Sequence, residues 1–180
     1  MTTTATEVVD GMAATLAAIH TESGANLLAL AEASPVLLVF LRHFGCPFCR
    51  KAISDVADLQ HELGYRGVRP VFVHLGTQEI AQKHFDYYGL SGVERVHDSG
   101  AAIYQLPAFA LSRQHPLWST LNPVVFWAWV KRALVKHGIG MIQGDGHQMP
   151  GIFFLDGPKI VRRFVHRTIA DEPDYLSLIE

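Results

Sequence analysis

Two apolar, β-rich runs separated by a helical segment constrain the fold of this chain most strongly. The first run, VLLVFLRHF, begins at Val36, and the second, VRPVFVHL, begins at Val68. Continuous apolar runs of this kind are typical of strands buried on both faces, as in a parallel sheet covered by helices. The segment between them, from Pro47 to about Leu63, carries apolar residues at helical spacings of three and four, and Gly64 is expected to close it. This order predicts parallel strands joined by a right-handed crossover.

Further elements extend the pattern on both sides of this unit. TQEIAQKHFDYYG reads as a helix with Thr77 as its cap and Gly89 after it. GIFFLDGPKIVRRFVHRT contains two β-rich runs joined by Asp156-Gly157, a strong hairpin signal. The remaining predicted elements are helices over 8–19 and 26–33, a short strand near 93–96, a mostly helical stretch over 101–137 and a short helix over 174–179.

Length and composition indicate one folded unit. A chain of 180 residues supports a substantial core but is short for two ordinary domains. Its residues are 49% hydrophobic and 18% charged, which predicts a packed globular protein. We therefore expect a single α/β domain over 1–180, with an N-terminal helical extension over 1–34 and a helical insertion over 98–142.

Charge and hydropathy exclude several classes of partner. The net charge is -2 and the basic residues are scattered, so neither nucleic acid nor an anionic membrane surface is an expected partner. Glu7 and Asp10 stand where a secretory signal would be positive. The most apolar later stretch, NPVVFWAWVKRALV, is interrupted by Lys131 and Arg132, so no membrane span is predicted. A cytoplasmic location is the expectation.

The chain contains two cysteines, Cys46 and Cys49, in the stretch FGCPFCRKA. Because Cys46 is placed where a strand meets a helix N-terminus, the helix dipole should stabilise its thiolate and lower its pKa. Arg42 and Arg50 could add to that field. Pro47 suits the first helical position, since its missing N–H would be unpaired there in any case. Cys49 lies one turn later on the apolar stripe and should be more buried than Cys46.

Three interpretations of the pair follow. A redox-active pair is favoured by a Cys-x-x-Cys motif beside a βαβ pattern. A metal site is the second, in which His43 joins both cysteines and leaves one position open, although structural zinc usually takes four ligands. Two inert core cysteines are the third. We expect no bound metal or cofactor.

Met149-Pro150 stands immediately before the apolar strand of the hairpin. A proline there indicates either a cis peptide bond at a turn beside the cysteines or a trans proline that starts the strand.

Taken together, these motifs resemble the thioredoxin fold, a central mixed β-sheet flanked by helices, over most of the chain. More narrowly, VFLRHFGCPFCR and MPGIFFLDGPKIV are similar to the peroxiredoxin-like group of the AhpC/TSA superfamily. The resemblance implies Cys46 as the attacking thiol, Cys49 as the resolving thiol and Pro150 as a cis-proline facing them. It places Arg42, His43, Pro47, Phe48 and Met149 as supporting or substrate-binding residues.

The sequence departs from that family at defined places. Val39 and His43 stand where a typical peroxiredoxin has a proline and a threonine or serine, so the hydroxyl that would position a peroxide is missing. His43 could polarise a peroxide oxygen, or it could be a surface or packing residue. The family's later-strand arginine has candidates only by position, Arg162 and Arg163. CPFC also resembles the glutaredoxin motif, but the glutathione-binding pattern expected downstream is absent.

The predicted function is a peroxiredoxin-like antioxidant enzyme that reduces peroxides and is reset by an external protein or small-molecule thiol. A thiol-disulfide oxidoreductase acting on protein disulfides is the alternative, and a non-enzymatic metal-binding or redox-switch module is the second alternative. An aromatic region contributes either core packing, a cap over the site or a homodimer face; its members are Trp118, Phe126, Trp127 and Trp129.

Overall fold

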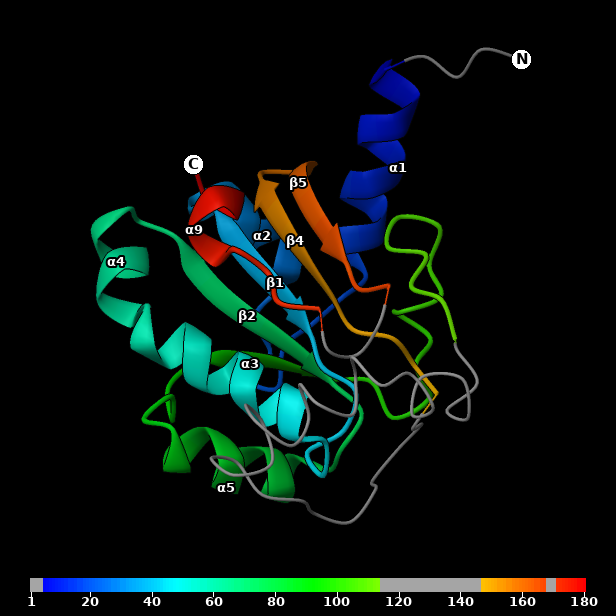
Figure 1. The fold of residues 1–180 in the computed structure, drawn as a ribbon. Helices are drawn as coiled ribbons and strands as arrows, with labels where there is room; N and C mark the ends of the chain where they lie inside the picture. Colours follow the sequence, from blue (N-terminus) through cyan, green and yellow to red (C-terminus); the bar gives the residue numbers. More distant parts are fainter. Residues whose placement is uncertain (1–4, 114–146, 168–170) are drawn as a thin grey trace.

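The computed structural model describes residues 5–113, 147–167 and 171–180, which are organised around one mixed β-sheet (Figure 1). Its strands are β1 (Val36–Phe40), β2 (Arg69–His74), β3 (Glu94–His97), β4 (Gly151–Asp156) and β5 (Lys159–Val165). In space their order is β3-β2-β1-β4-β5. β1, β2 and β3 run parallel, whereas β4 is antiparallel to both β1 and β5. The predicted α/β class with a mixed sheet is confirmed.

Strand β1 occupies the centre of the sheet and is buried along its whole length. Leu37 and Val39 belong to the apolar cluster on one face, and Leu38 and Phe40 belong to the cluster on the other. The prediction of a strand buried on both faces is therefore confirmed. The cysteine motif lies in the connection that follows the carboxyl end of β1.

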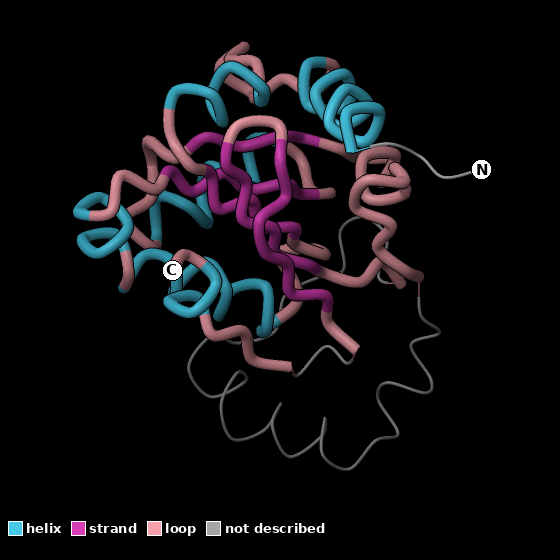
Figure 2. Tube along the Cα trace, turned by 90° about the horizontal axis from the view of Figure 1, so that it is seen from above, coloured by secondary structure: helices cyan, strands magenta, loops and turns pink. Residues whose placement is uncertain are grey.

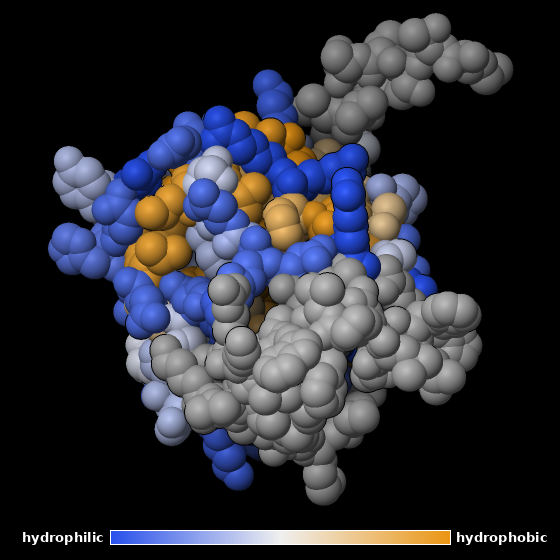
Figure 3. All heavy atoms as spheres, in the orientation of Figure 1, coloured by the Kyte–Doolittle hydropathy of each residue, from blue (hydrophilic) through white to orange (hydrophobic). Residues whose placement is uncertain are grey.

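Helices cover both faces of the sheet (Figure 2). One face is covered by α3 (Pro47–Asp58), α4 (Gln60–Tyr65), α5 (Gln78–Tyr87) and α9 (Tyr175–Leu178). The other face is covered by α1 (Ala5–Ala17), α2 (Leu27–Ala33) and a turn-rich segment ending near Leu111. Both helices of the predicted N-terminal extension are therefore present. On the face seen in Figure 3, the described residues are mainly hydrophilic, with apolar side chains visible in patches between them.

Two predicted helices differ from the structure. The helix expected to end at Leu63 is divided at Leu59 into α3 and α4, and Gly64 lies inside α4. The turn after α4 uses Gly67, whose positive φ of 68° favours glycine. Residues 101–113, expected to be helical, form turns and an isolated bridge. Ala101 and Ala110 have positive φ values of 55° and 46°, which lie outside the right-handed helical region. The rest of that stretch, including the three tryptophans, lies outside the described residues.

The predicted hairpin is confirmed, with Gly157 at φ 54° in its turn. Its register pairs Gly151 with Val165, so the end of β5 lies beside the start of β4. The chain after β5 is thereby brought to the same edge of the sheet as the cysteine motif. Within the described residues, no helix is long and apolar enough to cross a membrane.

Candidate active site

Cys46 lies between the end of β1 and the start of α3, as the sequence predicted. It is the N-cap residue of α3, and Pro47 occupies the first helical position. Its carbonyl accepts hydrogen bonds from the N–H groups of Cys49 and Arg50, at 3.1 and 3.2 Å. The N–H groups of Phe48 and Cys49 also interact with the Cys46 sulfur, which therefore lies at the positive end of the helix dipole.

Both cysteines are free thiols and both are buried, with residue exposures of 5% for Cys46 and 3% for Cys49. Cys49 is slightly the more buried of the two, as expected, but Cys46 is not exposed as an accessible nucleophile was expected to be. Both side chains belong to the apolar cluster formed by α3 and one face of the sheet, so that packing encloses the whole motif. Access to either sulfur is through the pocket described below.

The pKa values of the two thiols are shifted in opposite directions. The pKa of Cys46 is lowered to about 6, first by a hydrogen bond from the Cys49 side chain and then by the Arg42 charge and two backbone N–H groups, against the opposing effect of burial. The pKa of Cys49 is raised well above its usual value, chiefly by burial and by its role as donor to Cys46. The Arg42 backbone N–H donates to the Cys49 sulfur at 3.3 Å. At neutral pH, Cys46 is the thiolate and Cys49 the thiol.

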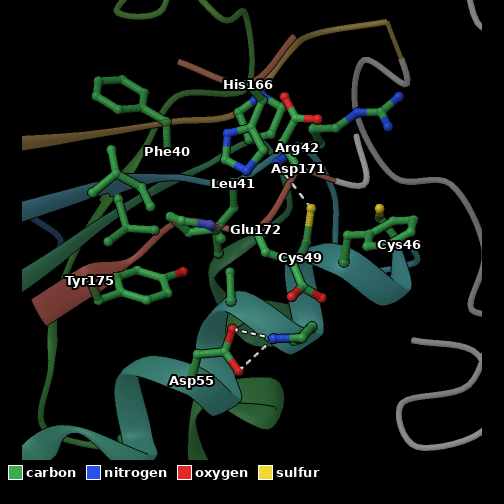
Figure 4. Close-up of a pocket in the computed structure, with 17 residues that line it drawn as sticks. Phe40, Leu41, Arg42, Cys46, Cys49, Asp55, His166, Asp171, Glu172 and Tyr175 are labelled. Atoms are coloured by element: carbon green, nitrogen blue, oxygen red, sulfur yellow. Dashed lines mark hydrogen bonds and ion pairs between the residues drawn. The ribbon is translucent and has the colours of Figure 1, made fainter. Parts of the chain in front are cut away.

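A small pocket with a volume of about 40 Å³ opens beside the pair and is partly open to solvent (Figure 4). Its lining comes from three parts of the chain. The lining residues are Val39, Phe40, Leu41 and Arg42 from β1 and the following turn; Cys46, Phe48, Cys49, Lys51, Ala52 and Asp55 from α3; and Pro150, Ile152, His166, Asp171, Glu172, Pro173 and Tyr175 from the hairpin and C-terminal segment.

The C-terminal wall of the pocket was not anticipated from the sequence. His166 follows β5, and the Pro150 carbonyl accepts a hydrogen bond from its ring. Burial lowers the pKa of His166 to about 4, so the ring is neutral at neutral pH. The signal that could have found His166 is the hairpin register, which places the residue after Val165 beside the residue before Gly151. No comparable signal identifies Tyr175.

The structure brings some predicted site residues together and separates others. Arg42, Phe48 and Pro150 line the pocket with both cysteines. Pro47 and Met149 do not line it, because Pro47 is buried at the helix start and Met149 is 1% exposed in the core. These two residues support the backbone on either side of the pocket.

The Met149-Pro150 peptide bond is trans, because no cis bond occurs in the described chain. The cis-proline implied by the resemblance is therefore a wrong prediction for this structure. The Met149 backbone N–H donates to the Ser112 carbonyl at 3.0 Å, which ties this segment to the turn-rich chain beside it. Pro150 still faces the cysteines as part of the pocket wall.

His43 is buried at 7% exposure and lies outside the pocket lining. Burial, followed by the charges of Arg42 and Arg50, lowers its pKa to about 4. Its Nδ1 atom makes no hydrogen bond with a described residue. The His43 ring is thus neutral and buried, and it is the backbone carbonyl of His43 that accepts the Cys46 N–H at 3.0 Å.

Arg162 and Arg163, the positional candidates for a peroxide-binding arginine, are exposed on β5 and absent from the pocket lining. Arg162 instead donates to the Ser177 carbonyl at 3.0 Å. Arg42 is the arginine that lines the pocket with the cysteines, and it comes from the turn immediately after β1.

A second buried polar cluster lies at the carboxyl end of β2, close to the motif. His74 is fully buried; its Nε2 faces a Glu22 carboxylate oxygen at 2.9 Å and its Nδ1 faces the Gly76 carbonyl at 3.0 Å. Arg95 Nε donates to the other Glu22 oxygen at 2.9 Å. Burial lowers the pKa of His74, and Glu22 partly offsets this effect. We call Glu22, His74 and Arg95 the β2-end cluster.

Phe44 connects the β2-end cluster to the cysteine motif. Its ring packs against His74 at 5.4 Å and stacks on His84 at 5.0 Å, measured between ring centroids. Its carbonyl accepts a hydrogen bond from Arg50 Nε at 2.6 Å. Phe44, two residues before Cys46, is therefore held through both its side chain and its backbone.

Among the described residues, no three side chains of His, Cys, Asp or Glu come together in an arrangement that could hold a metal ion. His43, the third ligand considered from the sequence, does not line the pocket into which both cysteines open.

The sheet order, with the cysteine motif between β1 and α3, defines a thioredoxin-like fold, and solved structures share it. A peroxidoxin, BcpB, from Mycobacterium tuberculosis superposes with a TM-score of 0.57 at 13% identity, covering 84% of this chain and 82% of that one. Peroxiredoxin Q from Xanthomonas campestris gives 0.56 at 14% identity, with coverage of 84% and 81%. A secreted M. tuberculosis disulfide oxidoreductase homologous to DsbE of E. coli gives 0.54 at 15% identity, with coverage of 92% and 96%.

At the level of sequence, this chain is similar to two fish proteins named prostamide/prostaglandin F synthase. The Danio rerio protein is 27% identical over 146 residues, covering 77% of this chain and 69% of the relative. The Salmo salar protein is 28% identical over 160 residues, covering 85% and 75%. No family model matches the chain.

Proposed function

We propose that this chain is a thiol-dependent oxidoreductase of the peroxiredoxin-like kind, which reduces peroxides through Cys46 and Cys49. The observation that carries the proposal is the inequality of the two thiols. The pKa of Cys46 is about 6, so Cys46 is a thiolate nucleophile at neutral pH. The pKa of its hydrogen-bond donor Cys49 is raised, so Cys49 stays protonated until Cys46 has reacted.

The reaction follows in two steps. The Cys46 thiolate attacks one oxygen of the peroxide, so an S–O bond forms, the O–O bond breaks, and the leaving alkoxide or hydroxide takes up a proton. Cys46 is then a sulfenic acid. The Cys49 thiol attacks that sulfur, forming the Cys46–Cys49 disulfide and releasing water with the Cys49 proton. An external dithiol reduces the disulfide, and the cycle needs no bound cofactor.

Comparisons with other proteins support this reaction class. The fold is shared with peroxiredoxins of solved structure. The fish relatives are named prostamide/prostaglandin F synthase, so an organic peroxide belongs beside hydrogen peroxide among the substrates to be tested. A cytoplasmic site of action, a protein or small-thiol reductant and a homodimer remain predictions.

Thiol-disulfide exchange is the second candidate, and a specific observation favours it. Where a peroxiredoxin would place a hydroxyl three residues before its cysteine, this chain has His43, whose ring lies outside the pocket. Attack of Cys46 on a disulfide would give a mixed disulfide, which Cys49 resolves with release of the second substrate thiol. This route uses the same inequality of the two thiols and needs no oxygen-positioning hydroxyl.

The rate of Cys46 oxidation separates the two candidates. Pre-reduced protein is mixed with hydrogen peroxide, with cumene hydroperoxide and with oxidised dithiothreitol, and each rate constant is set against that of free cysteine. We expect a peroxide rate constant several orders of magnitude above that of free cysteine. If the peroxide rate constant is near that of free cysteine and exchange with oxidised dithiothreitol is fast, thiol-disulfide exchange would replace peroxide reduction as the proposed function. The Cys49→Ser variant should stop at the sulfenic acid.

A further inference from the structure

Tyr104 approaches the cysteine motif from the opposite face of the sheet. It belongs to the turn-rich segment after β3 and to the apolar cluster on the face away from the cysteines, where its side chain is fully buried. Its ring packs edge-on against Phe40, with the ring centroids 4.9 Å apart. Its hydroxyl donates to the Leu41 carbonyl and to the Val73 carbonyl, the latter at 3.0 Å. The hydroxyl therefore lies at the carboxyl end of β1, where the chain turns toward the cysteines.

The Leu41 carbonyl belongs to the same peptide group as the Arg42 N–H. That N–H donates to the Cys49 sulfur at 3.3 Å, and the Cys49 side chain in turn donates to Cys46. A continuous series of hydrogen bonds thus runs from the Tyr104 hydroxyl, through one planar peptide group, to both sulfurs.

Hydrogen bonds in such a series strengthen one another. A peptide group that accepts a hydrogen bond at its carbonyl oxygen is polarised, so its N–H becomes a stronger donor. Burial and Cys46 raise the pKa of Cys49, whereas the charge and the backbone N–H of Arg42 lower it. Tyr104 therefore acts on Cys49 without touching it, because it strengthens the hydrogen bond that favours the Cys49 thiolate.

The Tyr104 hydroxyl keeps its proton and so remains a donor. Burial raises the pKa of Tyr104 well above its usual value, and the charges of Cys49 and Asp98 add to this effect. Burial also raises the pKa of Tyr175, whose hydroxyl likewise interacts with Cys49. The two tyrosines are thus neutral neighbours of Cys49, and the ionised groups that act on it are the Cys46 thiolate and Arg42.

We propose that Tyr104 is a positioning residue for the resolving step: through the Leu41–Arg42 peptide group, its hydroxyl stabilises the negative charge on the Cys49 sulfur as Cys49 attacks the oxidised Cys46. This inference rests on the proposed function, which assigns Cys46 as the first nucleophile. It holds for a sulfenic acid and for a mixed disulfide, because Cys49 makes the same attack on Cys46 in either case.

Methyl methanethiosulfonate, a compact reagent, separates the two steps and suits the small pocket beside the cysteines. The Cys46 thiolate attacks its divalent sulfur, forming a methyl disulfide on Cys46 and releasing methanesulfinate. The Cys49 thiolate then attacks the Cys46 sulfur, forming the Cys46–Cys49 disulfide and releasing methanethiolate. Pre-reduced protein is treated with one equivalent of reagent and quenched with acid, and mass spectrometry gives a rate constant for each step.

Tyr104→Phe keeps the ring and removes the hydroxyl. The rate constant of the second step should fall about threefold at pH 7, and its pH profile should move upward by about 0.5 unit, because the Arg42 N–H becomes a weaker donor. The first step should change far less, since Cys46 does not accept this hydrogen bond.

Phe109→Leu is the matched control for lost packing at the same place. The buried Phe109 ring also packs against Phe40 at 4.9 Å, and it has no hydroxyl to donate to the Leu41 carbonyl. Both variants should lower the free energy of unfolding in urea, but only Tyr104→Phe should slow the second step.

An unchanged second step in Tyr104→Phe, or an equal slowing in Phe109→Leu, would overturn the inference. Iodoacetamide tests the proposed function separately, because the Cys46 thiolate displaces its iodide as a C–S bond forms and the C–I bond breaks. If Cys46 of the parent protein reacts as slowly as an ordinary thiol, the proposed function fails. Fast alkylation of Cys46 with an unaltered second step in Tyr104→Phe removes only the role of Tyr104, so the two failures are distinguishable.

Discussion

The cysteine pocket and the β2-end cluster lie close together at the carboxyl ends of neighbouring parallel strands, yet their polar groups are arranged in opposite ways. In the β2-end cluster both nitrogens of His74 and both oxygens of Glu22 have a partner, and only Arg95 Nη1 lacks one among the described residues. In the pocket, His166 Nδ1 and the Tyr175 hydroxyl have none among the described residues. Satisfied buried groups stabilise one arrangement of the chain, whereas each unsatisfied buried group lowers its stability. The contrast assigns stability to one region and chemistry to the other.

The largest expected effect is at Cys46. Cys46→Ser removes the nucleophile, and peroxide or disulfide turnover should fall to background in an assay coupled to dithiothreitol. Cys49→Ser should retain a single oxidation, detected by mass spectrometry after trapping with dimedone. Full activity in Cys46→Ser would mean that the nucleophile has been misassigned.

The next largest effect is on stability, at His74. His74→Leu removes a partner of the buried Glu22 and should lower the free energy of unfolding in urea by about 3 kcal/mol. The alkylation rate of Cys46 in the folded protein should change far less. His61→Leu, at an exposed position, is the control and should leave stability within about 0.5 kcal/mol. If the His74→Leu variant is as stable as its parent, the β2-end cluster does not stabilise the fold as proposed.

The pH dependence of alkylation sharpens the description of the pocket. Because only the thiolate reacts, the rate should rise as pH increases through about 6 and level off above it. Cys49→Ala removes the largest cause of the lowered pKa and should move the midpoint upward; Arg42→Gln should move it upward by less. Arg66→Gln, distant from the pocket lining, should leave it unchanged. A midpoint near that of free cysteine in the parent protein would contradict the thiolate assignment.

The smallest effect tests the connection between the two regions through Phe44. A Cβ at Gly76 would stand 2.7 Å from the Phe44 ring, so Gly76→Ala must displace that ring. We expect a loss of about 1–2 kcal/mol in stability, typical of overpacking, and a change of a few fold in Cys46 alkylation. At Gly92 an added Cβ meets nothing within 4 Å, so Gly92→Ala is the matched control. Altered stability with unaltered alkylation would show that the two regions are not connected through this ring.

Local patterns predicted the fold well because its elements have strong local causes. β1 is buried on both faces as its continuous apolar run indicated, and Asp156-Gly157 forms the expected turn. Cys46 at the helix start followed from the same pattern. The division of the helix at Leu59 could not be predicted, because no proline or glycine marks it. Turns at 101–113 replace the expected helix, and the positive φ of Ala110, 46°, could not be predicted because no glycine marks that position.

The site was predictable only where it is local in sequence. Arg42, Cys46 and Cys49 lie within one strand-to-helix connection, so spacing alone brings them together. His166 and Tyr175 reach the pocket through the pairing of β4 with β5 and the packing of α9, which are long-range contacts. The burial of Cys46 likewise depends on tertiary packing, which spacing along the chain does not encode.

The hydrogen bond from the Arg42 backbone N–H to the Cys49 sulfur has a spectroscopic consequence. Formation of a Cys46–Cys49 disulfide changes the electron density and position of that sulfur, and therefore the shielding of the Arg42 amide proton. The chemical shift of the Arg42 amide proton, followed by NMR in a titration with oxidised and reduced dithiothreitol, reports the redox state of the Cys46–Cys49 pair. The same titration gives the reduction potential of the disulfide, and so the range of cellular thiols able to reset it.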